Sequence, residues 1–357
     1  MSWDRGPRTL VSRMRMPEAG GYVRRQVETM TQTMLDIAMI TTAVELACRA
    51  PSLHNSQPWR WVATTTSVDL FVDPDRTVTS TDRSGREAII SCGASLHHFR
   101  VAMAAIGWDV KVGQFPNPHN LDHLASIDFA SVDHVTQARR DRARAIVRRR
   151  TNRLPFRAPK HWASFEPVLR SSFESELVTL DVLAKDARWR LAEASRLTEA
   201  LRRYDDQYQH ELDWWTAPLR ASEGIPQSAL VSESDGGRVD VNRRFPTDPS
   251  DERSSAGTYD QAKILVLGTP RDTRADALNS GEALSAILLE CTMAGLATCP
   301  VTHVTELEAS RNIIRELTRG RAAVPQVLVR VGIEPEDEFV SEPTPRRPLS
   351  DVLEIRR

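Results

Sequence analysis

Two segments of the chain resemble each other closely enough to predict an internal duplication. The segment Gly93–Gly107 aligns with Gly281–Gly295 without a gap, at an offset of 188 residues. The glycines at both ends coincide, Leu96 matches Leu284, and most other apolar positions correspond. Each segment is typical of a buried helix that ends at glycine, the residue that best adopts the left-handed conformation there. Two unrelated hydrophobic helices could also match this well, so duplication is the preferred interpretation of two.

Strand-like segments surround both predicted helices. Ser84 and Glu87 have the spacing of a capping box, which predicts the start of the first helix. Alternation or continuous apolar runs predict strands at Trp59–Thr66, Val68–Val72, Leu124–Phe129, Leu177–Leu183, Lys263–Leu267 and Gln326–Val331. Because helices and strands interleave, we expect an α+β fold in which helices cover a sheet.

The chain divides into an extension and two related halves. Residues 1–33 carry six arginines but no long apolar core, so we expect a disordered extension, or translation that starts at Met30 or Met34. We place the first half at residues 34–135 and the second at 136–357. Residues 210–260 are rich in Gly, Ser, Pro and Asp, which indicates an insertion that is either disordered or a lid. Apolar residues in its first part, such as Trp214 and Ile225, favour a lid.

Composition excludes several classes of protein. The 357 residues have a formal net charge of −1, so no global positive field is present to hold nucleic acid or an anionic membrane. No apolar run reaches the roughly 18 residues that a membrane span needs. The four cysteines are widely spaced and none forms a CxxC pair, which is typical of reduced thiols in the cytoplasm.

Several common catalytic motifs are absent from the sequence. It contains no GxGxxG turn, no GxxxxGK[ST] phosphate loop, no HExxH and no GxSxG. The cysteines and histidines are too loosely spaced for a zinc site. We therefore expect no metal, and the residues alone assign no catalytic acid, base or nucleophile.

The loop Ala50–Trp59 is the first of three segments whose side chains could bind a ligand. Pro51 ends the preceding helix and Pro58 stiffens the entry to the next strand, and between them lie hydroxyl and amide side chains. Such a loop can present polar groups to a heterocycle or a phosphate, but it can equally be an ordinary turn. We expect Gln57 and Trp59 to be structural.

Two arginine-rich segments could bind an anion. Arg148–Arg153 lies at the end of a charged helix that begins near Thr136, and its guanidinium groups and a threonine hydroxyl could bind phosphate. The same cations could instead stabilise the helix C-terminus. Only four of the 47 basic residues are lysines, so an arginine cluster carries less information here than in other chains. The third segment, Thr344–Leu349, would by itself be read as a frayed tail.

Together these segments resemble the FMN-dependent nitroreductase fold. The resemblance rests on Pro51-Ser52-x-x-Asn55-Ser56-Gln57-Pro58-Trp59, Arg149-Arg150-Thr151-x-Arg153 and Arg346-Arg347-Pro348. Longer phrases, including Ser91–Ala94, Gly281–Ser285 and Gly295–Pro300, are similar to the Acg-type NAD(P)H nitroreductase family of mycobacteria and related actinobacteria. The resemblance covers roughly residues 36–355.

The resemblance implies a single FMN site shared between the halves. Ordinary nitroreductases are homodimers with two flavins at the interface, whereas here the proline-rich loop occurs only in the first half and the arginine motifs only in the second. This implies a monomeric pseudo-dimer. Arg149, Thr151 and Arg153 would hold the ribityl phosphate, and Arg347, together with Arg346, would supply further positive charge. The loop would reach the ribityl chain and ring, and Cys299–His303 would pass near flavin N5. The implied cofactor residues are Pro51, Ser52, Asn55, Arg149, Thr151, Arg153, Thr302, Arg346 and Arg347.

The same resemblance implies two possible functions. In the first, NAD(P)H reduces FMN and is replaced by a quinone- or nitro-type acceptor, a reaction that needs no titratable protein side chain. In the second, the insertion at 210–260 covers the ring, and the protein stores FMN without turnover. Whether the chain is an enzyme is left open between these two.

Overall fold

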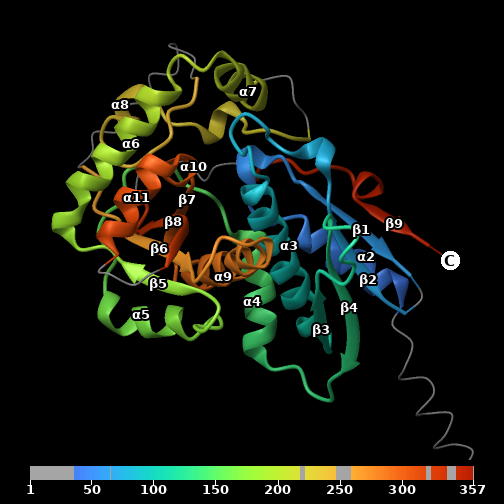
Figure 1. Ribbon diagram of the computed structural model, residues 1–357. Coiled ribbons are helices and arrows are strands. Elements are labelled where there is room, and N and C mark those ends of the chain that lie inside the picture. The colour runs from blue at the N-terminus through green and yellow to red at the C-terminus, as the bar shows by residue number, and fades with distance from the viewer. Residues whose placement is uncertain are drawn as a thin grey trace, which may run out of the picture. The chain divides into compact units, whose positions relative to one another are not determined.

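The computed structural model describes residues 36–64, 66–217, 222–246, 259–318, 323–335 and 343–356 (Figure 1). The extension predicted for residues 1–33 lies outside this part of the chain. The described residues form a mixture of helices and two β-sheets, so the expected α+β class is confirmed. No helix among them is long and apolar enough to cross a membrane.

The first sheet has the strand order β3-β4-β2-β1-β9. Its strands are β1 (Trp59–Ala63), β2 (Val68–Val72), β3 (Trp108–Gln114), β4 (His123–Ser131) and β9 (Leu353–Ile355). β1 ends three residues earlier than predicted because Thr64 turns back and its N–H donates to the Ser67 carbonyl. β9 pairs in parallel with β1, so the C-terminus of the predicted second half completes the first sheet.

The second sheet has the order β5-β6-β8-β7. Its strands are β5 (Thr179–Val182), β6 (Lys263–Thr269), β7 (Ala297–Val301) and β8 (Val324–Gly332). Every neighbouring pair is antiparallel, as are the pairs among β1 to β4. The two sheets thus share one strand order, with β7, β8, β6 and β5 in the places of β3, β4, β2 and β1. A register shift also occurs in both β2 and β6, next to Phe71 and Gly268.

Helices α3 (Arg86–Ala105) and α9 (Arg274–Met293) pack against each other between the sheets (Figure 1). Each has 20 residues, and their bounds differ by the offset of the sequence repeat. Gly107 and Gly295, which follow them, have φ of +93° and +71°, so the predicted glycine ends are confirmed. The predicted capping box is wrong, because Gly85 is the N-cap and no side chain forms a capping hydrogen bond there.

Close contact between α3 and α9 depends on one glycine from each helix. A Cβ on Gly93 would lie 2.1 Å from the Leu278 carbonyl oxygen, and one on Gly281 would lie 2.0 Å from the Ile90 carbonyl oxygen. The two contacts are reciprocal, since all four residues are related by the same offset. His97 Nδ1 and Ser285 Oγ, also 188 residues apart, lie 2.8 Å from each other.

The remaining helices cover these central elements. They are α2 (Ile37–Ala47), α4 (Gln137–Arg148), α5 (Trp162–Arg170), α6 (Arg188–Arg202), α7 (Asp206–Thr216), α8 (Glu233–Gly236), α10 (His303–Glu306) and α11 (Glu308–Leu317). α7 begins before the predicted insertion and extends into its first residues, where the sequence shows no clear periodicity. Its N-cap Asp205 accepts a hydrogen bond from the Tyr208 N–H, and its buried Leu212 and Trp215 anchor it.

Candidate functional site

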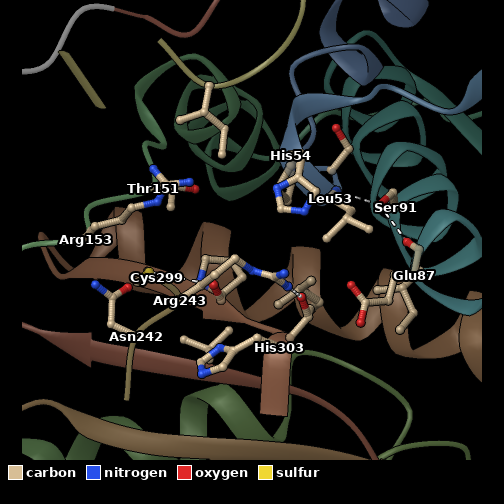
Figure 2. A pocket seen from close by; sticks show the side chains of 18 of the residues that line it. Leu53, His54, Glu87, Ser91, Thr151, Arg153, Asn242, Arg243, Cys299 and His303 are labelled. Atoms are coloured by element: carbon tan, nitrogen blue, oxygen red, sulfur yellow. Dashed lines mark hydrogen bonds between the residues drawn. The ribbon is translucent and has the colours of Figure 1, made fainter. Parts of the chain in front are cut away.

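A cavity lies where α3, α9, β7, the loop after α2 and the insertion meet (Figure 2). It has two neighbouring chambers, whose walls share Pro51, Ser52, Thr151, Arg153 and Ile225. The inner chamber contains about 760 Å³ of empty space, part of it open to solvent, and is also lined by residues of α3 and of the Cys299–His303 segment. The second, which we call the arginine chamber, contains about 540 Å³.

The loop after α2 has an unusual backbone. His54, Asn55 and Gln57 have φ of +48°, +58° and +53°, a region that residues other than glycine seldom occupy. Side-chain hydrogen bonds hold this conformation: the Gln57 N–H donates to Ser52 Oγ at 3.0 Å, and Asn55 Nδ2 donates to the Pro345 carbonyl at 3.1 Å. Such outliers persist where the surroundings impose them, and they cluster at functional sites.

The unusual backbone conformation of this loop places the His54 ring in the wall of the inner chamber. The ring is buried, lines the inner chamber and packs edge-on against Phe245, with ring centroids 5.7 Å apart. Neither ring nitrogen has a hydrogen-bond partner among the described residues. Burial, with Arg243 and Arg153 nearby, holds the pKa of His54 well below its usual range, so the ring is neutral.

The arginine chamber concentrates positive charge without a counter-ion. It is lined by Arg49, Arg149, Arg150, Arg153 and Arg346, and none of its described lining residues is acidic. Burial and the neighbouring arginines lower the pKa of Arg149 to about 10 and that of Arg346 to about 9. Because buried cations are costly unless they are paired, this chamber is suited to an anion.

Arg149 carries the clearest sign of a missing partner. Its side chain is buried, and Nη2 donates to the Arg49 carbonyl at 3.3 Å. Within the described chain, its Nε and Nη1 have no acceptor. By contrast, Arg346 donates to the carbonyls of Cys48 and Arg49 at 2.7 and 3.1 Å, which fixes it beside Arg149. Two N–H groups of this guanidinium are thus left without an acceptor, and the oxygens of a phosphate are acceptors that such charged donors bind strongly.

The structure brings eight of the nine sequence-predicted cofactor residues to this cavity. Pro51, Ser52, Thr151 and Arg153 line both chambers, Asn55, Arg149 and Arg346 line the arginine chamber, and Thr302 lines the inner one. Arg347 does not join them. Its guanidinium donates to the carbonyls of Gln57 and Asp351 at 3.3 and 2.9 Å and lies 3.5 Å from Asp73, so it supports the loop instead.

The insertion forms one wall of the cavity. Asn55 Nδ2 donates to the Gly224 carbonyl at 2.9 Å, and Gln57 Nε2 donates to the Ser222 carbonyl at 3.0 Å. Arg243 and Phe245 from the same insertion line the inner chamber, and Arg153 stacks on the Phe245 ring at 5.3 Å. The polar side chains of the loop therefore bind the insertion, a use that the sequence alone did not indicate.

A buried ionic cluster that sequence reasoning missed lies at the other end of the inner chamber. Arg243 forms an ion pair with Glu306 and donates to the Tyr208 hydroxyl at 2.8 Å. Glu87, from the first turn of α3, accepts a hydrogen bond from Arg86 at 3.2 Å. The side chains of Glu87 and Arg243 reach into the same space (Figure 2). The spacing of Ser84 and Glu87 predicts a capping role for Glu87, so the sequence did not indicate that Glu87 lines the chamber.

A second cavity lies on the other side of the α3–α9 pair and is lined by β3 and the segment that follows α5. It contains arginines too, but each has a carboxylate partner. Arg100 lies 2.7 Å from Glu282, Arg139 lies 3.0 Å from Asp109, and Arg142 pairs with Glu290. The described part of this cavity therefore offers no uncompensated positive charge.

The fold is an α+β arrangement of two related sheets, and its cavity carries arginines without a described acidic partner at one end. No protein-family model matches the chain. It is 52% identical over 327 residues to the Mycobacterium tuberculosis H37Rv protein named "Putative NAD(P)H nitroreductase acg", covering 92% of this chain and 98% of that protein. It is 53% identical to "Uncharacterized protein Rv3127" of the same strain, over 89% of this chain and 94% of that one. The chain therefore belongs to the Acg-type NAD(P)H nitroreductase family.

Solved nitroreductase structures are more distant. NfnB from Mycobacterium smegmatis, an FMN-dependent nitroreductase in complex with NADPH, has 16% identity and a TM-score of 0.39, covering 62% of this chain and all of that one. A nitroreductase with bound FMN from Bacteroides fragilis has 14% identity and a TM-score of 0.36, covering 56% of this chain and 92% of that one.

Proposed function

We propose that this protein binds one FMN per chain and passes electrons from NAD(P)H to a quinone- or nitro-type acceptor. The observation that carries the proposal is the arginine chamber, where Arg149 is buried with two open donors and no acidic residue lines the described wall. This chamber adjoins the inner one, which is lined largely by uncharged residues. This combination fits a phosphate joined to a flat heterocycle, and the names of the relatives favour the same cofactor chemistry.

Each chamber would receive one part of the cofactor. Arg149, Thr151, Arg153 and Arg346 would hold the phosphate, and Pro51, Ser52 and Asn55 would border the ribityl chain. The segment that contains Thr302 would run beside the reactive edge of the ring. Bound FMN supplies the hydride and electron-transfer chemistry, while the protein orients the partners and excludes water.

The site would be single because the chain is a fused dimer. Four features support residues 34–135 and 136–357 as its halves: one strand order in both sheets, the matching bounds of α3 and α9, the reciprocal glycine contacts and the two cavities on opposite sides of the helix pair. In the second cavity the ion pairs of Arg100, Arg139 and Arg142 remove the charge that a phosphate needs.

A second candidate function is the storage of FMN without turnover. The hydrogen bonds from Asn55 and Gln57 to the insertion, and the ion pair of Arg76 with Glu223, favour it because they hold the insertion against the site. In this state a nicotinamide could not stack on the ring. Turnover would then require the insertion to move.

Anaerobic reduction separates the two functions. We expect the FMN-loaded protein to lose its visible flavin bands within seconds of mixing with NADPH or NADH. Reduction by dithionite alone would instead support storage. A protein that cannot be loaded with FMN would contradict both.

A further inference from the structure

Glu87 lines the inner chamber, and one of its buried carboxyl oxygens lacks a hydrogen-bond partner among the described residues. Its side chain is 3% exposed and comes from the first turn of α3. Oε1 accepts the hydrogen bond from Arg86. Oε2 accepts no hydrogen bond of ordinary geometry from the residues that the structure describes, although the Thr302 hydroxyl lies near enough to the carboxyl group to lower its pKa. A buried polar atom left unpaired is costly, so Oε2 calls for either a proton of its own or a group on a ligand.

The groups that face Glu87 decide its charge. Burial and the carboxylate of Glu306 on α10 raise the pKa of Glu87 to about 7, while Arg86, Arg243 from the insertion and the Thr302 hydroxyl oppose this rise. Asp82, which precedes α3, is raised to a pKa of about 6 by burial and by Glu87. Glu87 therefore holds a proton below neutral pH and loses it above.

The histidines of the chamber do not compete for this role. His54 and His303 both line it, and burial holds the pKa of each well below its usual range. Both are neutral at physiological pH. His303 Nε2 is also engaged, since it lies 2.7 Å from Ser195 Oγ.

We propose that Glu87 is the proton donor to the electron acceptor, an inference that rests on the proposed function. Reduction of a quinone to a hydroquinone consumes one hydride, which derives from NAD(P)H, and one proton. The O–H bond at Glu87 Oε2 breaks and a new O–H bond forms on the quinone oxygen. The carboxylate that remains is stabilised by Arg86 and Arg243 and regains its proton from water.

Reoxidation of pre-reduced protein tests the proposal. FMN-loaded protein is reduced with dithionite and mixed with 1,4-benzoquinone in a stopped-flow instrument between pH 5.5 and 8.5. We expect the wild-type rate to fall as pH rises through about 7, because the protonated form of Glu87 is lost. In Glu87→Gln the rate at pH 6 should be about 10²–10⁴-fold lower and independent of pH.

A matched control removes a carboxylate elsewhere. Glu282 is largely buried, lies in the second cavity and pairs with Arg100 at 2.7 Å. Glu282→Gln should keep the wild-type rate and pH profile. Glu87→Asp, which keeps the acid on a shorter side chain, should retain a pH-dependent rate and serves if Glu87→Gln does not fold.

Infrared spectroscopy supplies a reading that does not depend on turnover. We expect a protonated-carboxyl band that titrates near pH 7, is absent from Glu87→Gln and persists in Glu282→Gln. Loss of the band with an unchanged reoxidation rate would overturn the donor role and leave the proposed function standing. A wild-type protein that takes up no FMN would overturn both, and a pH-independent Glu87→Asp would also overturn the donor role.

Discussion

Replacing Arg149 and Arg153 together by alanine is expected to yield a protein that purifies without colour. Arg149 has two open donors in the arginine chamber, and Arg153 lines both chambers. A hydrogen bond to a charged group contributes about 1.5–3 kcal/mol, so losing one bond from each arginine should weaken FMN binding about 10²–10⁴-fold. Fluorescence titration with FMN measures the change directly.

The control for this pair removes two arginines that lie outside the chamber. Arg140 and Arg148 belong to α4, which leads into the same motif, and both are exposed. Arg140→Ala with Arg148→Ala should keep the yellow colour and bind FMN as the wild type does. A fully yellow protein from the Arg149 and Arg153 pair would refute the placement of the phosphate.

Gly93→Ala should destabilise the protein by about 2 kcal/mol or more. The new methyl carbon would lie 2.1 Å from the Leu278 carbonyl oxygen, so α3 and α9 would have to separate. Alanine gains up to about 1 kcal/mol in helix propensity, but overpacking against backbone costs about 1–3 kcal/mol and occasionally more. The backbone atom cannot rotate away as a flexible side chain would, which places this site at the costly end. Thermal unfolding should show a lower midpoint.

Gly113→Ala is the matched control. Gly113 lies in β3, where an added Cβ would come no closer than 3.8 Å to the Ser126 carbonyl oxygen. Its unfolding midpoint should stay close to that of the wild type. If Gly93→Ala is as stable as Gly113→Ala, then the close approach of α3 and α9 contributes little to the stability of the protein.

Local patterns made much of this fold predictable. The six predicted strands and the two glycine-terminated helices are all present. They were predictable because alternating apolar residues and terminal glycines depend on the local burial and conformation of the backbone. β9 was missed because its pairing with β1 joins residues from opposite ends of the chain. α7 was missed because its apolar residues, such as Leu212 and Trp215, occur amid a segment rich in loop-forming residues.

Only those residues of the candidate site that belong to a recognisable sequence motif could be predicted. The proline-rich loop and the first arginine motif converge on one cavity, as the resemblance implied. Arg347 stands beside Arg346 in sequence but faces Asp73, a difference of side-chain direction that adjacency cannot reveal. Glu87 and Arg243 come from segments about 150 residues apart, so no spacing along the chain could have joined them.

The most direct test of a single flavin site built within one chain is the FMN content of the purified protein. Flavin absorbance, set against protein concentration and the molar mass from light scattering, gives the number of FMN per chain and the number of chains per particle. We predict one FMN per monomeric chain of 40.1 kDa. Two FMN per chain, or one FMN shared between two chains, would contradict the account.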